Sequence, residues 1–254
     1  MIAPLLLLLA MGGAPPPVPS AQVCARLRLH DHPAQATACF QSLAEAADPE
    51  AQAEGDWGLG LYAEANAAFR AAVARADAGH DTAAAVRGRV RWGRLLQARF
   101  NDADAEGLFK EALRRDPNAA TAYLGLALIS ADGFDGKALV YARRAASLDP
   151  KLAEPAVLLA TLALEDSDPA TAATEVQRAL EVQPDDLDAM AVQVAIAVLA
   201  EKVPDGWLQR IAVINAHYGH ADEAVGDQLV LHRRYATAAE WYRKAVALSP
   251  DLWS

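Results

Sequence analysis

The sequence is poor in aromatic residues and in cysteine. Phe, Trp and Tyr together make up 6% of its 254 residues, and the only cysteines are Cys24 and Cys39. A low aromatic content beside abundant alanine, a strong helix former, argues against a sheet protein and for closely packed helices. Apolar residues make up 53% of the chain and charged residues 22%, a balance that excludes a largely disordered protein.

The sequence also lacks an excess of positive charge. It carries 23 Lys and Arg against 33 Asp and Glu, which gives a formal net charge of −10. Without a basic run, and with an acidic total, nucleic-acid binding is not expected. The charge is uneven, because residues 153–186 hold eight acidic residues and one basic residue, whereas residues 57–118 hold ten basic and eight acidic residues.

Motifs of the common catalytic and metal sites are missing as well. There is no His-Glu-x-x-His, no glycine-rich phosphate loop and no Gly-x-Ser-x-Gly elbow. The two cysteines lie too far apart for a Cys-x-x-Cys motif, and the histidine clusters at 30–32 and 217–220 each offer two ligands, fewer than a usual zinc site. We therefore expect no catalytic residue, no metal and no cofactor, and a protein that is not an enzyme.

The first residues have the pattern of a signal peptide. The apolar run Leu5–Leu9 is too short to span a bilayer, and a Gly/Ala/Pro stretch follows it. We interpret residues 1–21 as a signal peptide and Pro-rich linker, with cleavage near Ala14 or Ser20, and expect a periplasmic or extracellular protein. No Lys or Arg precedes the run, which is also compatible with a start further upstream.

In such a compartment Cys24 and Cys39 are expected to form a disulfide across the turn at 30–33, stapling the first helical hairpin. The alternative is two small buried thiols in a helical core.

A repeat runs through most of the chain. Four segments rich in Ala and Leu end in a proline, at Pro117, Pro150, Pro184 and Pro250. Because proline cannot continue a helix, each of these residues marks the end of a helix. The prolines are 33, 34 and 66 residues apart, which indicates a unit of that period with one proline missing from the series.

This pattern resembles the tetratricopeptide repeat family, whose unit of about 34 residues is a helix–turn–helix. The family places small residues at unit positions 8, 20 and 27, a large one at 24 and proline at 32. In the unit that starts at Val86 these positions hold Gly93, Ala105, Ala112, Phe109 and Pro117, and the units from Ala153 and Gly219 match equally. The unit from Ala120 fits with one residue deleted. The resemblance implies an all-α, superhelical solenoid of about six to seven antiparallel helix pairs.

The domain organisation follows from this register. We expect a divergent N-terminal hairpin over 22–48 and an array over 46–252, with a degenerate unit at 187–218, where Gly206 and Tyr218 replace the usual alanine and proline. Residues 77–85 are expected to lengthen one junction, and residues 253–254 to begin a truncated further helix. The units are 46–79, 86–119, 120–152, 153–186, 187–218 and 219–252.

In this family, positions 2, 5, 9, 12 and 13 of the first helices line a concave groove. The resemblance therefore assigns the following residues to a partner-binding groove that runs from basic to acidic: Arg87, Val90, Arg91, Arg94, Thr121, Leu124, Leu128, Glu154, Val157 and Thr161. Arg87 and Arg91 also match the basic half of the carboxylate clamp of some members, but Ala51 stands where that clamp has an asparagine. The alternative is that the arginines only solvate a helix.

The resulting hypothesis is a non-catalytic, exported scaffold that binds a protein or peptide partner in its groove. One alternative is the N-terminal repeat arm of a larger exported enzyme, with a metallopeptidase-like domain after Ser254. Another is a structural role through end-on self-association at an uncapped C-terminal edge.

Overall fold

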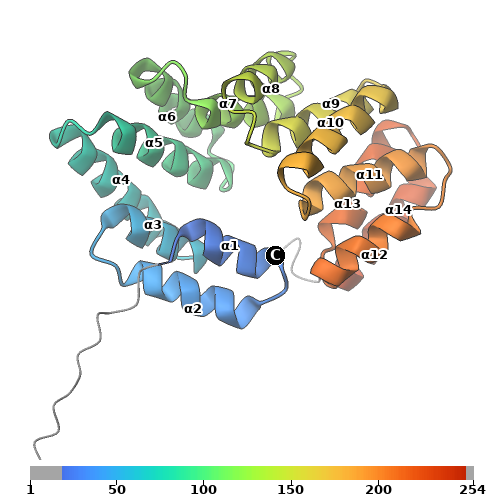
Figure 1. The fold of residues 1–254 in the computed structure, drawn as a ribbon, viewed down its shortest axis with the longest axis horizontal. Coiled ribbons are helices and arrows are strands. Elements are labelled where there is room, and N and C mark those ends of the chain that lie inside the picture. Colours follow the sequence, from blue (N-terminus) through green and yellow to red (C-terminus); the bar gives the residue numbers. More distant parts are fainter. Residues whose placement is uncertain (1–18, 250–254) are drawn as a thin grey trace, which may run out of the picture.

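In the computed structural model, which describes residues 19–249, the chain forms fourteen α-helices and no strand. The helices make seven antiparallel pairs that follow one another along a curve (Figure 1). This confirms the predicted all-α repeat solenoid and gives it seven pairs. The signal peptide expected at the N-terminus and the helix expected at 253–254 lie outside the described residues, apart from 19–21.

The pairs, in chain order, are α1 (Ala21–Leu29) with α2 (Pro33–Ala44), α3 (Pro49–Gly58) with α4 (Tyr62–Ala78), α5 (Thr82–Gln97) with α6 (Asp102–Arg115), α7 (Ala120–Asp132) with α8 (Lys137–Leu148), α9 (Glu154–Glu165) with α10 (Pro169–Val182), α11 (Leu187–Leu199) with α12 (Asp205–Ile214), and α13 (His220–Leu231) with α14 (Tyr235–Leu248). Helices α6, α8 and α10 each end two residues before the proline that the sequence gives as a helix terminator.

The helices form two layers. From α5 onward each first helix contacts the first helix of the next pair, so that α5, α7, α9, α11 and α13 form a continuous inner layer. The second helices α2, α4, α6 and α8 lie towards the outside of the curve (Figure 1). None of the helices over residues 19–249 is both long and apolar enough to cross a membrane.

Small residues set the distance between helices, as the repeat pattern predicts. Phe109 is fully buried and lies between Gly93 of its own pair and Gly125 of the next pair. A Cβ atom on Gly93 would lie 2.6 Å from Phe109 Cε1, and one on Gly125 would lie 2.3 Å from Phe109 Cζ. Because real Cβ contacts are never this short, the ring fits only where both helices carry glycine.

The turns inside the pairs also share one backbone conformation. Position 15 of five successive units adopts the left-handed conformation, with φ between 51° and 59° at Phe100, Phe134, Ser167, Glu201 and Arg233. The conformation recurs in the degenerate unit 187–218 and in the unit with a deletion. The repeat register is therefore retained where the side-chain pattern weakens.

One prediction about the junctions is wrong. Residues 77–85 do not lengthen a loop, because α4 extends to Ala78 and α5 begins at Thr82. The additional residues instead give these helices 17 and 16 residues. Asp81 caps α5 by accepting a hydrogen bond from the Ala84 N–H at 2.9 Å, and the alanines that follow favour helix.

The degenerate unit differs in how its second helix packs. At position 20 the regular units have a buried alanine, such as Ala105 or Ala172, whereas a Cβ on Gly206 would meet nothing within 4 Å. Helix α13 packs directly on α11, and α12 makes few contacts with either. Helix α12 thus stands away from the array, with Val213 87% exposed.

The first hairpin is held by a disulfide. Cys24 of α1 and Cys39 of α2 are bonded, with their Cα atoms 5.3 Å apart. Cys24 is fully buried beside Ala36, Phe40 and Leu43, so the bond forms part of the small core of this hairpin.

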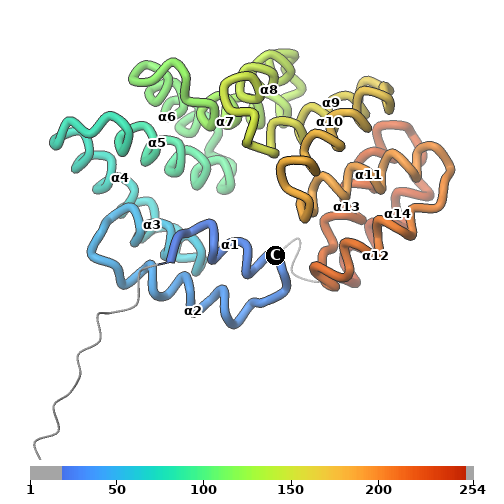
Figure 2. Tube along the Cα trace, viewed as in Figure 1, coloured from blue at the N-terminus to red at the C-terminus, as the bar shows by residue number. Residues whose placement is uncertain are grey.

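The curve brings this hairpin against the other end of the array. In the trace, α1 and α2 lie beside α12 (Figure 2). Arg26 on α1 donates a hydrogen bond to Asp185, which lies between α10 and α11, and His30 Nε2 lies 3.2 Å from the same carboxylate.

A second set of bonds lies alongside, between the α1–α2 turn and the α12–α13 loop. Asn215 Nδ2 donates to the Leu29 carbonyl at 3.0 Å, and His217 Nδ1 lies 3.0 Å from Asp31 Oδ2. We call these contacts together with those of Asp185 the closing contact. The solenoid is therefore bent into a nearly closed ring.

Candidate binding groove on the concave face

Two of the three arginines in the predicted groove, Arg87 and Arg91, are paired with carboxylates of the protein itself. Arg87 donates from Nε and Nη2 to the carboxylate of Glu50 on α3, at 2.6 and 2.8 Å. Arg91 pairs in the same two-point way with Glu54, one helical turn further along α3. Paired in this way, these arginines do not form a free carboxylate clamp.

Arg89 lies on the other side of α5. Its side chain is 7% exposed and pairs with Asp77 at 2.7 Å and with Glu111 at 3.1 Å. The alternative interpretation, that the arginines of α5 only solvate a helix, therefore does not describe Arg89, whereas Arg87 and Arg91 are paired but keep side chains that are 58% and 39% exposed.

Arg94 forms no ion pair with any residue in the described range. It is half-buried, and burial lowers its pKa, as does the charge of Arg91, whereas the charge of Glu154 acts in the opposite direction. The pKa of Arg91 is raised, against the effect of burial, by its hydrogen bond with Glu54, and the charge of Glu154 adds to this rise. The structure thus brings the predicted groove residues Arg91, Arg94 and Glu154 into one electrostatic environment.

The remaining predicted groove residues differ in how far their side chains are exposed to solvent. Val90 and Leu124 are buried, at 5% and 3% exposure, and belong to hydrophobic clusters between helices, so they offer no binding surface. Val157 is half-buried against the core, and Thr121 is exposed on the first turn of α7.

Leu128 and Thr161 lie together in the wall of a pocket of about 490 Å³, which we call the concave pocket. Four consecutive inner helices, α7, α9, α11 and α13, contribute to it. Its floor is apolar and includes Leu128, Leu158, Leu164, Val192, Ala195 and Leu231. Three carboxylate residues line it, Asp132, Glu165 and Asp227, and no Lys, Arg or His does.

Most of this wall follows the position rule of the sequence analysis. Leu128, Thr161, Ala195 and Asp227 are all at position 9 of their units, and Asp132, Glu165 and Leu231 are at position 13. Of these seven residues, Leu128 and Thr161 are among the groove residues predicted from the sequence.

The sequence held no signal for three other wall residues, Phe134, Gln228 and Tyr242. Phe134 belongs to a turn, Gln228 is at position 10, and Tyr242 comes from an outer helix.

The carboxylates of the concave pocket have no cationic partner. Within residues 19–249 none of the three takes part in an ion pair. Burial raises the pKa of Glu165, and the charge of Asp166 raises it further. Burial and the charge of Asp102 likewise raise the pKa of Asp132, and a hydrogen bond from Gln97 partly opposes this rise.

Asp227 Oδ1 accepts a hydrogen bond from the Tyr242 hydroxyl at 2.6 Å, and burial raises the pKa of that hydroxyl well above its ordinary value. Tyr242 therefore stays protonated and acts as a donor at neutral pH.

Gln228 adds an unused acceptor to the same wall. Its side chain is 5% exposed, and Oε1 has no hydrogen-bond partner among the residues that the structure describes. A buried amide oxygen without a partner is unfavourable by about 1–3 kcal/mol. Together with the three carboxylates, it makes the concave pocket rich in acceptors.

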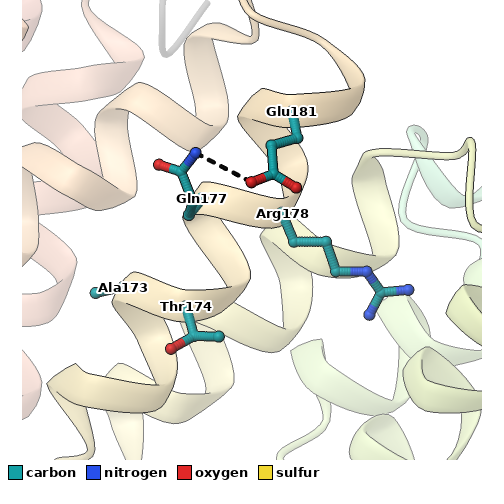
Figure 3. A pocket seen from close by; sticks show the side chains of 5 residues that line it. All are labelled: Ala173, Thr174, Gln177, Arg178 and Glu181. Atoms are coloured by element: carbon teal, nitrogen blue, oxygen red, sulfur yellow. Dashed lines mark hydrogen bonds between the residues drawn. The ribbon is translucent and has the colours of Figure 1, made fainter.

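A more open depression, of about 590 Å³, lies along the second helix α10 (Figure 3). All five residues that line it come from this one helix: Ala173, Thr174, Gln177, Arg178 and Glu181. Gln177 Nε2 donates to Glu181 Oε1 at 3.3 Å, and Arg178 reaches across to the Ala146 carbonyl at 3.3 Å. Because a single helix does not enclose a ligand, we do not consider this depression a binding site.

A metal site is not among the features of residues 19–249, where no three His, Cys, Asp or Glu side chains gather closely enough to hold an ion.

The chain matches no protein-family model and no curated protein in sequence. Solved structures share its arrangement of helix pairs. One is TTC0263, a thermophilic tetratricopeptide-repeat (TPR) protein of Thermus thermophilus, with a TM-score of 0.53 and 18% identity over 66% of this chain and 93% of that one. PilF of Pseudomonas aeruginosa has the same TM-score and identity, over 66% of this chain and 78% of its own.

A chain of the APC/C hetero-tetramer Cut9–Hcn1 is similar over a longer stretch. Its TM-score is 0.64 at 14% identity, with 91% of this chain aligned to 46% of that chain. This chain thus spans about half the length of that relative. At such identities the likeness concerns the fold, which is that of a tetratricopeptide-repeat solenoid.

Proposed function

We propose that the protein is a non-catalytic scaffold that binds a protein or peptide partner on its concave face. The observation that carries this proposal is the concave pocket, to which four consecutive repeats contribute residues at equivalent positions. A pocket of this size with an apolar floor and a few polar groups is typical of ligand sites. The fold supports the proposal too, since the Cut9–Hcn1 assembly joins a chain of this fold to a second protein.

Two threonines provide a matched test. Thr161 lies in the concave pocket and Thr174 lies outside it on α10, and each donates its hydroxyl proton to the carbonyl four residues earlier, at 3.2 and 3.0 Å. Wild type, Thr161→Arg and Thr174→Arg would be incubated with an array of peptides of varied sequence. We expect Thr161→Arg to lose the peptides that wild type binds and Thr174→Arg to keep them. Equal binding by the two variants would contradict the proposal.

We further propose that the protein acts in an exported, oxidising compartment. The pattern at Leu5–Leu9 motivates this, and the Cys24–Cys39 bond supports it, because disulfides persist in such compartments. Fusing residues 1–24 to a phosphatase that is active only after export would test it. We expect activity from the natural leader and a loss of activity with Leu7→Arg, whereas an inactive natural fusion would refute export.

A further inference from the structure

We propose that the concave pocket takes a cationic and apolar peptide segment, with a large apolar side chain on its floor and a Lys or Arg side chain against its carboxylates. This inference rests on the proposed function and names the chemistry of the partner. It is carried by the contrast between the two halves of the inner face.

The first step is the balance of charge along the inner face. Arg87 and Arg91 are already paired with Glu50 and Glu54. In contrast, Asp132, Glu165 and Asp227 have no cation beside them within residues 19–249, and they surround a single pocket. All three carboxylates are exposed to solvent and can therefore receive a cation of a ligand, whereas on the basic half Arg94 is the one groove arginine without an ion pair within residues 19–249.

The second step is hydrogen bonding. Gln228 Oε1 lacks a donor, and Asp227 receives one hydrogen bond, from Tyr242, which leaves its other oxygen available. An ammonium or guanidinium group carries three to five N–H donors and no acceptor. Such a group is complementary to a wall that offers acceptors in excess.

The third step is the apolar floor and its edge. Leucine and valine side chains from several inner helices form the floor, and Phe134 stands at the edge, 80% exposed. A ligand must therefore offer apolar surface as well as charge, which excludes a bare inorganic cation.

Three labelled ten-residue peptides would test the proposal by fluorescence anisotropy on the full chain. The first alternates Leu with Lys, the second replaces Lys by Glu, and the third replaces Leu by Ser. We expect the Leu/Lys peptide to bind at least tenfold more tightly than either of the others, and added salt to weaken its binding. Equal affinities for the Leu/Lys and Leu/Glu peptides, or no binding of the Leu/Lys peptide, would overturn the proposal.

Because the whole chain is acidic, charge removal needs a matched control. The double variant Asp132→Asn/Glu165→Gln acts in the pocket, and Asp104→Asn/Glu181→Gln removes the same charge from the outer helices α6 and α10. We expect the first to weaken Leu/Lys binding at least tenfold and the second less than twofold. Equal losses would show attraction by net charge alone and refute the site.

Phe134→Ser and Phe100→Ser form a second pair, since both residues are at position 15 and exposed, but only Phe134 lines the pocket. We expect a severalfold loss of affinity from the first and none from the second.

A failure of the inference can be told from a failure of the proposed function. If the array peptides depend on Thr161 but show no preference for Lys and Leu, the scaffold function stands and the cationic ligand is refuted.

Discussion

At the scale of single residues, Asp186 stabilises the protein by capping a helix and destabilises it when its buried carboxyl group ionises. It caps α11, accepting a hydrogen bond from the Ala189 N–H at 2.8 Å, and it is only 8% exposed. Burial raises its pKa to about 6, from an ordinary value of 3.8, and the charges of Asp188 and Glu154 add to the rise. The folded state therefore favours the neutral acid, and the favourable contribution of Asp186 is complete below pH 4 and is lost as the pH rises through 6.

We predict that Asp186→Asn stabilises the protein at pH 7.5. Asparagine keeps the capping oxygen but cannot ionise, so the burial of a charge is avoided. Relative to wild type the gain should be at most about 3 kcal/mol at pH 7.5 and should shrink towards pH 4. Urea unfolding of both proteins across this range would measure it. Asp186→Ala, which also loses the cap, should gain about 1 kcal/mol less. A pH-independent difference between Asp186→Asn and wild type would contradict the prediction.

The glycines around Phe109 give a second prediction at this scale. In Gly125→Ala the new Cβ would lie 2.3 Å from Phe109 Cζ, so ring or helix must shift. We expect a loss of about 1–3 kcal/mol in the free energy of unfolding, as for other overpacked cores. Chemical denaturation would measure this loss.

Gly107 is the natural control, because it lies inside α6 and a Cβ there would meet nothing within 4 Å. Gly107→Ala should stabilise the protein by up to about 1 kcal/mol, since alanine favours helix. If both alanine variants were equally stable, Phe109 would not be limited by the space between the two glycines.

At the scale of helices and pairs, the sequence pattern predicts the register well. Alanine, glycine, phenylalanine and proline recur at fixed positions because they perform one packing task in each unit. The pattern predicts less where helix propensity competes with a turn. Residues 77–85 contain a run of alanines, and these extend α5 instead of forming a loop.

The first hairpin supplies a prediction for an element. The Cys24–Cys39 bond closes a loop of 15 residues, for which the chain-entropy account gives a stabilisation of about 3 kcal/mol. In Cys24→Ser/Cys39→Ser we expect faster amide hydrogen exchange in α1 and α2 and unchanged exchange in α7 and α8. Exchange by mass spectrometry would resolve these peptides. Unchanged exchange in all four helices would show that packing alone holds the hairpin.

At the scale of the whole molecule, the sequence predicts the stack but not its closure. The curvature of a solenoid results from small rotations between successive pairs. No single sequence motif determines the total rotation. The same limit applies to the candidate site. Leu128 and Thr161 could be placed on the inner face from their positions, but the grouping of Asp132, Glu165 and Asp227 around one pocket depends on the curvature.

We predict that Asp185→Lys opens the ring. The change removes the contacts of Asp185 with Arg26 and His30 and sets two positive charges against each other. Exposed ion pairs contribute about 0.2–1 kcal/mol each, so the closed form should lose the stabilisation from Asp185 and keep only the contacts of Asn215 and His217. An increase in the radius of gyration by small-angle X-ray scattering would show the opening.

Glu240→Lys makes the same change of charge on α14, and Glu240 forms no ion pair with the described residues. Its scattering should match that of wild type. Raising the salt concentration should open wild type in the same direction as Asp185→Lys, because salt screens exposed pairs. Superimposable scattering curves for the two variants would rule out an electrostatic basis for the closure.

The closing contact has a consequence for how the chain would unravel. In a linear array the terminal repeats have one neighbour each and therefore fray first, so that unfolding proceeds inward from both tips. Here the bonds of Leu29 and Asp31 with Asn215 and His217 give the first hairpin a neighbour on each side. The first hairpin should then not be the first part to unfold, and α12, which makes few contacts with its neighbours, is a weak point of the array.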